Sequence, residues 1–66
     1  MTLVLTPELR ALALEHVITV LPGEFNRLGY AFRDAPDGML LRSDYRIEAD
    51  MIVVIAQALR ERAYQS

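Results

Sequence analysis

The chain contains no cysteine and only one histidine, His16. Disulfide bonds and thiolate metal sites are therefore excluded, and a single imidazole cannot make a zinc site, which needs several protein ligands. Residues 1–66 form one domain, and a chain this short buries only about 60% of the surface exposed when unfolded. Small domains often add a disulfide, a metal or an oligomeric partner to their core. With no cofactor expected, the sequence predicts a homodimer.

Lysine is also absent, so all seven basic residues are arginine. Arginine binds carboxylates and phosphates in a bidentate manner. We favour another explanation of the arginine-only composition, a GC-rich bacterial or bacteriophage genome whose codons favour arginine. The net charge of −2 gives no reason to expect a nucleic-acid partner.

Long apolar runs are missing. The longest stretch without a charged residue, Met51 to Leu59, is far shorter than the ~20 residues that span a bilayer. The N-terminus lacks the basic region of a signal peptide, and Glu8 and Arg10 interrupt its apolar stretch. The sequence therefore predicts a cytoplasmic protein that does not contact membranes.

No motif indicates catalysis. Ser43 and Ser66 do not lie near His16 in the sequence, the base that a nucleophile would need. Gly23, Gly29 and Gly38 form neither a dinucleotide-binding nor a phosphate-binding pattern. We predict no catalytic, metal-binding or cofactor-binding residue and expect that the protein is not an enzyme.

His16 has no acidic or ligand side chain at helical spacing around it, since its neighbours there are Leu12, Ala13, Thr19 and Val20. We interpret it as a half-exposed residue at the edge of an apolar face, with a pH-sensitive interface as the alternative.

The first predicted helix runs from Pro7 to about Leu21. Thr6 is a suitable N-cap, Pro7 suits the first helical position, and Pro22 ends the helix. Its apolar residues spread over about half the circumference, more than the ~100° that one core contact requires. One flank is therefore predicted to bind a partner, through Leu14, Ile18 and Leu21.

A second helix is predicted from Asp44 or Glu48 to Ala63. The run Met51 to Ile55 alone is compatible with a buried strand, but Ala56 to Ala63 is rich in helix formers. The apolar residues on its predicted buried face are Ile47, Met51, Ile52, Val54, Ile55, Ala58 and Leu59.

Between these helices, Tyr30–Asp34 alternates in polarity and Met39–Ser43 is largely apolar. The intervening Pro36-Asp37-Gly38 is a turn signal, so we predict a β-hairpin and an α+β fold of order α-β-β-α, with two amphipathic helices packed on one hairpin. A helix from Glu24 to Arg33 is the alternative, because Phe25, Leu28 and Phe32 also fit a helical face; the fold would then be an all-α bundle of three helices.

The hairpin segment combines arginine with tyrosine. Both residue types dominate protein-binding hot spots, and both suit a single-stranded nucleic-acid surface; the acidic net charge favours protein. Arg33 and Arg42 would face each other across the turn and form one basic spot. Salt bridges to nearby aspartates on a solvated face are the alternative. The predicted partner-binding residues here are Tyr30, Arg33, Arg42 and Tyr45.

The sequence thus predicts a small non-catalytic adaptor or inhibitor that binds another protein. The alternatives are a DNA-binding transcriptional regulator, with residues 24–33 in a helix-turn-helix, and a structural assembly subunit. A helix presenting several arginines on one exposed face would favour the regulator, and a hairpin of mixed charge would favour the adaptor.

Overall fold

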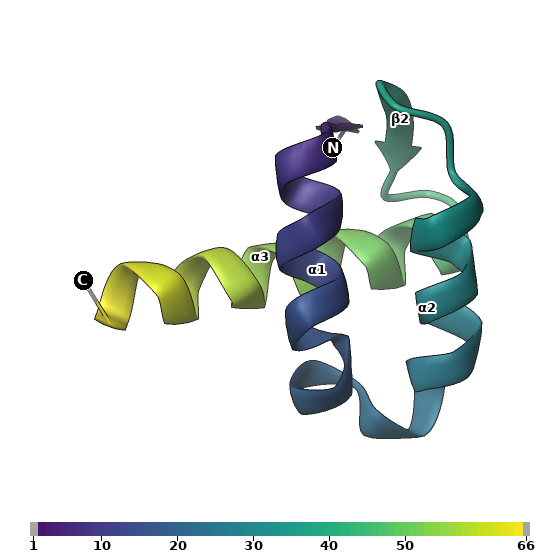
Figure 1. The fold of residues 1–66 in the computed structure, drawn as a ribbon. Helices are drawn as coiled ribbons and strands as arrows, with labels where there is room; N and C mark the ends of the chain where they lie inside the picture. The colour runs from purple at the N-terminus through teal and green to yellow at the C-terminus, as the bar shows by residue number, and fades with distance from the viewer. Residues whose placement is uncertain (1, 66) are drawn as a thin grey trace.

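A computed structural model of the chain describes residues 2–65. Helices α1 and α2 lie side by side and antiparallel, α3 crosses behind both, and two strands cover one end (Figure 1). The expected α+β class, with helices packed on one antiparallel pair of strands, is confirmed. The elements in chain order are β1 (Thr2–Leu5), α1 (Pro7–Val20), the 3₁₀ turn η1 (Pro22–Glu24), α2 (Phe25–Asp34), β2 (Met39–Arg42) and α3 (Arg46–Gln65).

The strands do not form the hairpin expected over residues 30–43. The segment expected as its first strand belongs to α2, which was the alternative interpretation, and β2 pairs with the N-terminal β1. Helical spacing buries Leu28 and Phe32 completely and leaves Tyr30 exposed. A strand would turn all three side chains to the same face, so the helix lets the two most apolar residues enter the core while the tyrosine stays in solvent.

The start of α1 agrees with its sequence signals. The hydroxyl of Thr6 accepts a hydrogen bond from the Leu9 amide at 3.2 Å, and Pro7 occupies the first turn. The helix ends at Val20, where the Leu21 amide still donates to the Val17 carbonyl at 3.0 Å before Pro22 begins η1.

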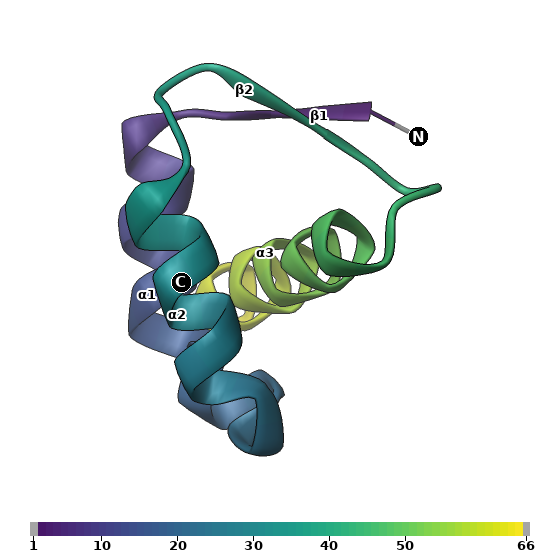
Figure 2. The same cartoon turned by 90° about the vertical axis from the view of Figure 1, so that its right-hand side faces the viewer.

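The core forms where α3 lies in the corner between the helix pair and the strands (Figure 2). Most of the predicted buried face of α3 is confirmed, since Met51, Ile52, Val54, Ile55 and Ala58 are buried. Leu59 is exposed instead, because the C-terminal half of α3 extends past the rest of the molecule (Figure 1). No described helix is long and apolar enough to cross a membrane.

Gly38 is required by the turn that leads into β2. Its φ is +81°, the only positive value among the described residues, and the turn is closed by a 3.1 Å hydrogen bond from the Met39 amide to the Pro36 carbonyl. A type II turn needs this conformation at its third position. The Gly38 amide also donates to the Leu5 carbonyl at 2.8 Å, which joins the turn to β1.

We expect Gly38→Ala to lower the free energy of unfolding by about 1–2 kcal/mol, because a Cβ is disfavoured at positive φ. Urea unfolding measures the change. Gly23→Ala is the matched control, since Gly23 has neither a positive φ nor an atom within 4 Å of an added Cβ. Equal effects from the two substitutions would contradict this role of Gly38.

Candidate partner-binding site

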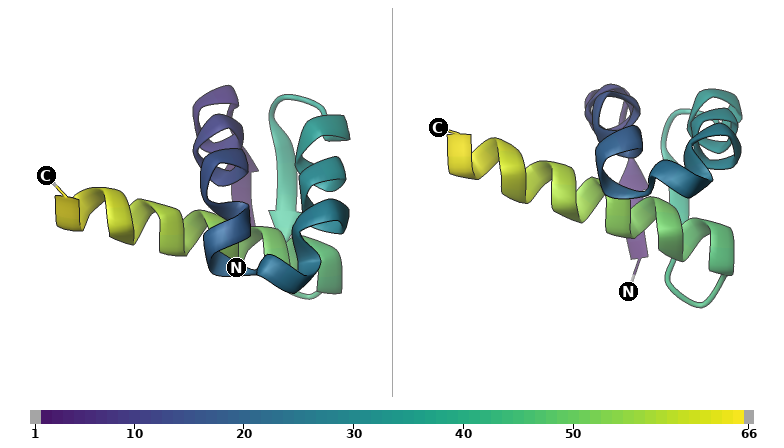
Figure 3. Two further views of the ribbon diagram at one scale, coloured as in Figure 1. Left: turned by 60° about the horizontal axis from the view of Figure 1, so that its bottom comes forward. Right: turned by 90° about the horizontal axis from the view of Figure 1, so that it is seen from below.

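An apolar groove runs between the outer faces of α1 and α2. Its volume is about 270 Å³. The short turn η1 connects the two helices and keeps them adjacent along this face (Figure 3). The groove is lined by Leu14 from α1 and by Phe25, Asn26, Gly29, Tyr30 and Arg33 from α2.

The apolar side chains around this groove remain in contact with solvent. Leu14, Phe25 and Tyr30 are exposed, and so is Ile18, one helical turn beyond Leu14 on α1. Gly29 also lines the groove, and the space where its Cβ would stand is open. Adjacent exposed apolar residues of this size are typical of a binding surface.

Arg33 and Tyr30 form the polar rim of the groove. The guanidinium carbon of Arg33 lies 4.6 Å from the centroid of the Tyr30 ring, and its Nε donates to Asp34 Oδ1 at 3.0 Å. The hydrogen bond to Asp34 raises the pKa of Arg33, so the side chain stays charged at any physiological pH. These contacts hold the cation beside the aromatic ring.

The structure brings together only part of the predicted partner-binding set. Leu14, Tyr30 and Arg33 line the groove, and Ile18 lies beside it. Leu21 is half-buried and packs against the core, so little of it is offered to a partner.

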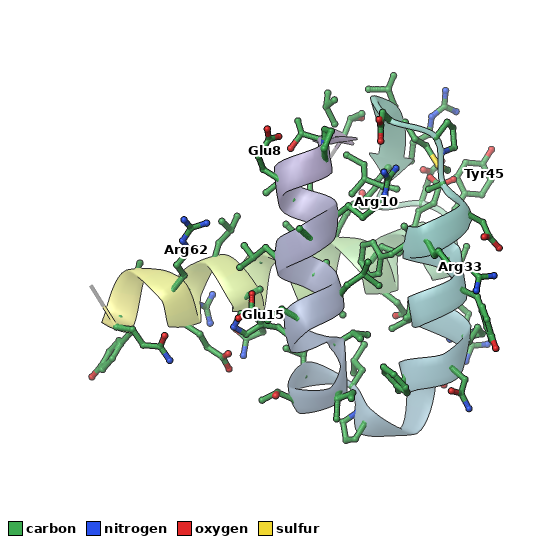
Figure 4. The ribbon with its side chains drawn as sticks, in the orientation of Figure 1. Glu8, Arg10, Glu15, Arg33, Tyr45 and Arg62 are labelled. Carbon is green, nitrogen blue, oxygen red and sulfur yellow. The ribbon has the colours of Figure 1, made fainter. Side chains whose placement is uncertain are left out.

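Arg42 and Tyr45 belong to a different part of the molecule. Arg42 ends β2, where its backbone amide donates to Glu48 Oε2 at 2.7 Å, and Tyr45 is exposed in the turn before α3. The expectation that Arg33 and Arg42 face each other across a hairpin is wrong, because Arg33 lies on a helix and points outward from it (Figure 4).

Comparison with known proteins finds no matching protein family, curated protein or solved structure.

A second depression, about 360 Å³ in volume, separates α1 from the projecting end of α3. It is polar and carries both charges, with Glu8 and Glu15 on α1 and Arg62 on α3 (Figure 4). Its other lining residues are Ala11, Leu12, His16 and Gln65. Within residues 2–65, no group of three histidine or acidic residues is arranged to hold a metal ion.

His16 has an acidic neighbour that the sequence pattern did not reveal. Its Nδ1 lies 2.9 Å from the Leu12 carbonyl, which can only accept, so Nδ1 carries the proton. Nε2 then faces Glu61 Oε2 at 3.7 Å. Because Glu61 is on α3 and lies 45 positions away in the chain, no helical spacing around His16 could have indicated it.

Arg10 is a further residue whose role the sequence did not suggest. Its Nε donates to the Phe32 carbonyl at 2.9 Å, and its two terminal nitrogens reach the Ala35 carbonyl and the Asp37 carboxylate. One side chain from α1 thereby holds the end of α2 and the following turn. It thus ties α1 to the C-terminal end of α2, the two helices that form the groove.

Proposed function

We propose that this protein is a non-catalytic adaptor or inhibitor that binds another protein by taking an apolar side chain into the groove between α1 and α2. The observation that supports it is the cluster of exposed apolar side chains around that groove. At about 270 Å³, the groove lies near the lower end of the ~300–1,000 Å³ range of pockets that enclose small molecules. It suits one or two side chains of a protein segment. A cytoplasmic location remains a prediction from the sequence.

The rim defines the chemistry of the partner segment. Asp34 accepts a hydrogen bond from the Nε of Arg33, and a guanidinium has further donors in a fork that matches a carboxylate. A fitting partner therefore presents a large aliphatic or aromatic residue with an aspartate or glutamate close to it. Arginine and tyrosine side by side are typical of the residues that contribute most to protein interfaces.

One observation supports the DNA-binding alternative and another argues against it. Residues 25–34 are helical, as that alternative requires. The arginines of this helix are, however, paired with acids: Arg27 contacts Glu24 at 2.6 Å and Asp50 at 3.1 Å, and Arg33 contacts Asp34. Their charge is offset within the fold, and the chain as a whole is acidic, so we favour a protein partner.

Gly29→Met tests the groove directly. No atom lies within 4 Å of a Cβ added at Gly29, so the helix tolerates the longer side chain, which then fills the groove. Peptides selected from a random library on the wild-type protein should carry an apolar residue next to an acidic one. We expect Gly29→Met to weaken their binding at least ~30-fold, as loss of a hot-spot contact worth ~2 kcal/mol does.

Gly23→Met is the control, because that glycine also has open space around it but lies in η1, outside the groove lining. It should bind the peptides like the wild type. Retention of binding by Gly29→Met, with unchanged circular dichroism, would contradict the groove as the binding site. A steep fall in affinity with salt, with a log–log slope beyond about −3, would instead indicate phosphate contacts and a nucleic-acid partner.

A further inference from the structure

One edge of β1 is unpaired. Among residues 2–65, β1 pairs only with β2, and a two-stranded sheet is marginal by itself. Proteins usually protect a free strand edge with a charge, a proline or a bulge. The four residues of β1, Thr-Leu-Val-Leu, contain neither charge nor proline. The other strand, β2, is better protected at its edge. It carries the charged Arg42, and the backbone amide of that residue donates a hydrogen bond to Glu48.

Helix α3 extends beyond this free edge. It passes beneath β2 and then β1, and it continues past β1 toward its C-terminus (Figures 1, 2 and 3). A third strand added to β1 would therefore lie over the projecting half of α3. The sheet would grow in the direction in which the helix runs.

One row of side chains along α3 is buried at first and becomes exposed toward the C-terminus. Glu48, Ile52, Ile55 and Leu59 follow helical spacing, and the Arg42–Glu48 hydrogen bond places this row on the side of the sheet. Ile52 and Ile55 are 6% and 1% exposed, whereas Leu59 is 43% exposed. Leu59 lies about 6 Å beyond Ile55 along the helix, close to the ~4.8 Å spacing at which the next strand would follow β1.

We propose that a second copy of this chain supplies the missing strand, with the two β1 strands antiparallel at the centre of a four-stranded sheet. A strand paired antiparallel with itself is related by a two-fold axis, so the same contact forms twice. Each β1 then covers Leu59 of the other copy. Because β1 is uncharged, self-pairing brings no like charges together on these strands. This contact is separate from the groove and from the α1 flank that the sequence suggested for the dimer.

The test compares two lysine substitutions. Val4 and Leu40 pair across the sheet, point to its outer face and are similarly exposed, at 47% and 51%. Val4→Lys puts two like charges beside the two-fold axis and should give a monomer in light scattering at micromolar concentration. Leu40→Lys, one strand farther from the axis, should keep twice the 7.5 kDa chain mass, as should the wild type.

Two further variants test whether Leu59 on α3 is covered in the dimer and whether the dimer forms through α1 instead. Leu59→Lys should also weaken the dimer, and Ile18→Lys on α1 should leave it intact. Amide hydrogen exchange of residues 2–5 should slow as the wild-type concentration rises and stay unchanged in Val4→Lys. Peptide binding by Val4→Lys tests the groove independently of the dimer.

A wild-type protein that stays monomeric would overturn the proposal, even if that monomer bound a strand from another protein. So would a dimer that dissociates with Ile18→Lys but persists with Val4→Lys, or a dimer equally sensitive to Val4→Lys and Leu40→Lys.

Discussion

Ile55→Ala is expected to lower the free energy of unfolding by about 2–5 kcal/mol, the usual range for an isoleucine truncated in a packed core. The side chain is almost completely buried and belongs to the central cluster with Leu5, Val17 and Phe32. Small domains seldom gain more than ~3–5 kcal/mol from their core, so the variant should be largely unfolded at physiological temperature. Urea or thermal unfolding followed by circular dichroism measures the loss.

Val53→Ala is the matched control in the same helix. Val53 lies outside the buried face of α3 and is exposed in the structure. Its replacement removes little packing and introduces a better helix former, so stability should hardly change. If the two variants melt alike, the buried face of α3 has been assigned wrongly.

Arg10→Ala is expected to cost about 2–3 kcal/mol, because hydrogen bonds to charged groups contribute about 1.5–3 kcal/mol. The substitution leaves the carbonyls of Phe32 and Ala35 without their donor and removes the ion pair with Asp37. Arg10→Lys should recover only part of the loss, since an ammonium group cannot reproduce the fork of a guanidinium. The measurement is again urea unfolding.

Arg33→Ala serves as the comparison for Arg10. Its guanidinium is exposed and, among the described residues, contacts only the adjacent Asp34 and the Tyr30 ring, so its removal should leave unfolding unchanged. If Arg33→Ala lowered the free energy of unfolding as much as Arg10→Ala, the hydrogen bonds that Arg10 makes to α2 and the following turn would not explain its effect.

The sequence predicted those elements whose signals are local. Thr6 and Pro7 marked the start of α1, and the apolar spacing in α3 identified its buried face. The segment around Phe32 was ambiguous because Tyr30–Asp34 alternates in polarity like a strand, whereas Phe25, Leu28 and Phe32 fit a helical face. Burial of Leu28 together with Phe32 decided for the helix, and that burial depends on α1 and α3.

The candidate site was partly predictable for the same reason. Leu14, Tyr30 and Arg33 were recognised from residue type and from the overwide apolar face of α1. Their meeting in one groove depends on the antiparallel packing of α1 with α2. Arg42 was grouped with them because of a hairpin that does not form.

The sequence alone determined where α1 begins, which face of α3 is buried, and that neither disulfides nor thiolate metal sites stabilise the fold. Capping and helical periodicity act between residues a few positions apart, so the local sequence is enough to predict these features. Tertiary structure alone decided the pairing of β1 with β2, the contacts of Arg10 with the end of α2, and the approach of Glu61 to His16. Each joins segments more than 20 positions apart, and their hydrogen bonds and charges meet only after the helices have packed around a common core.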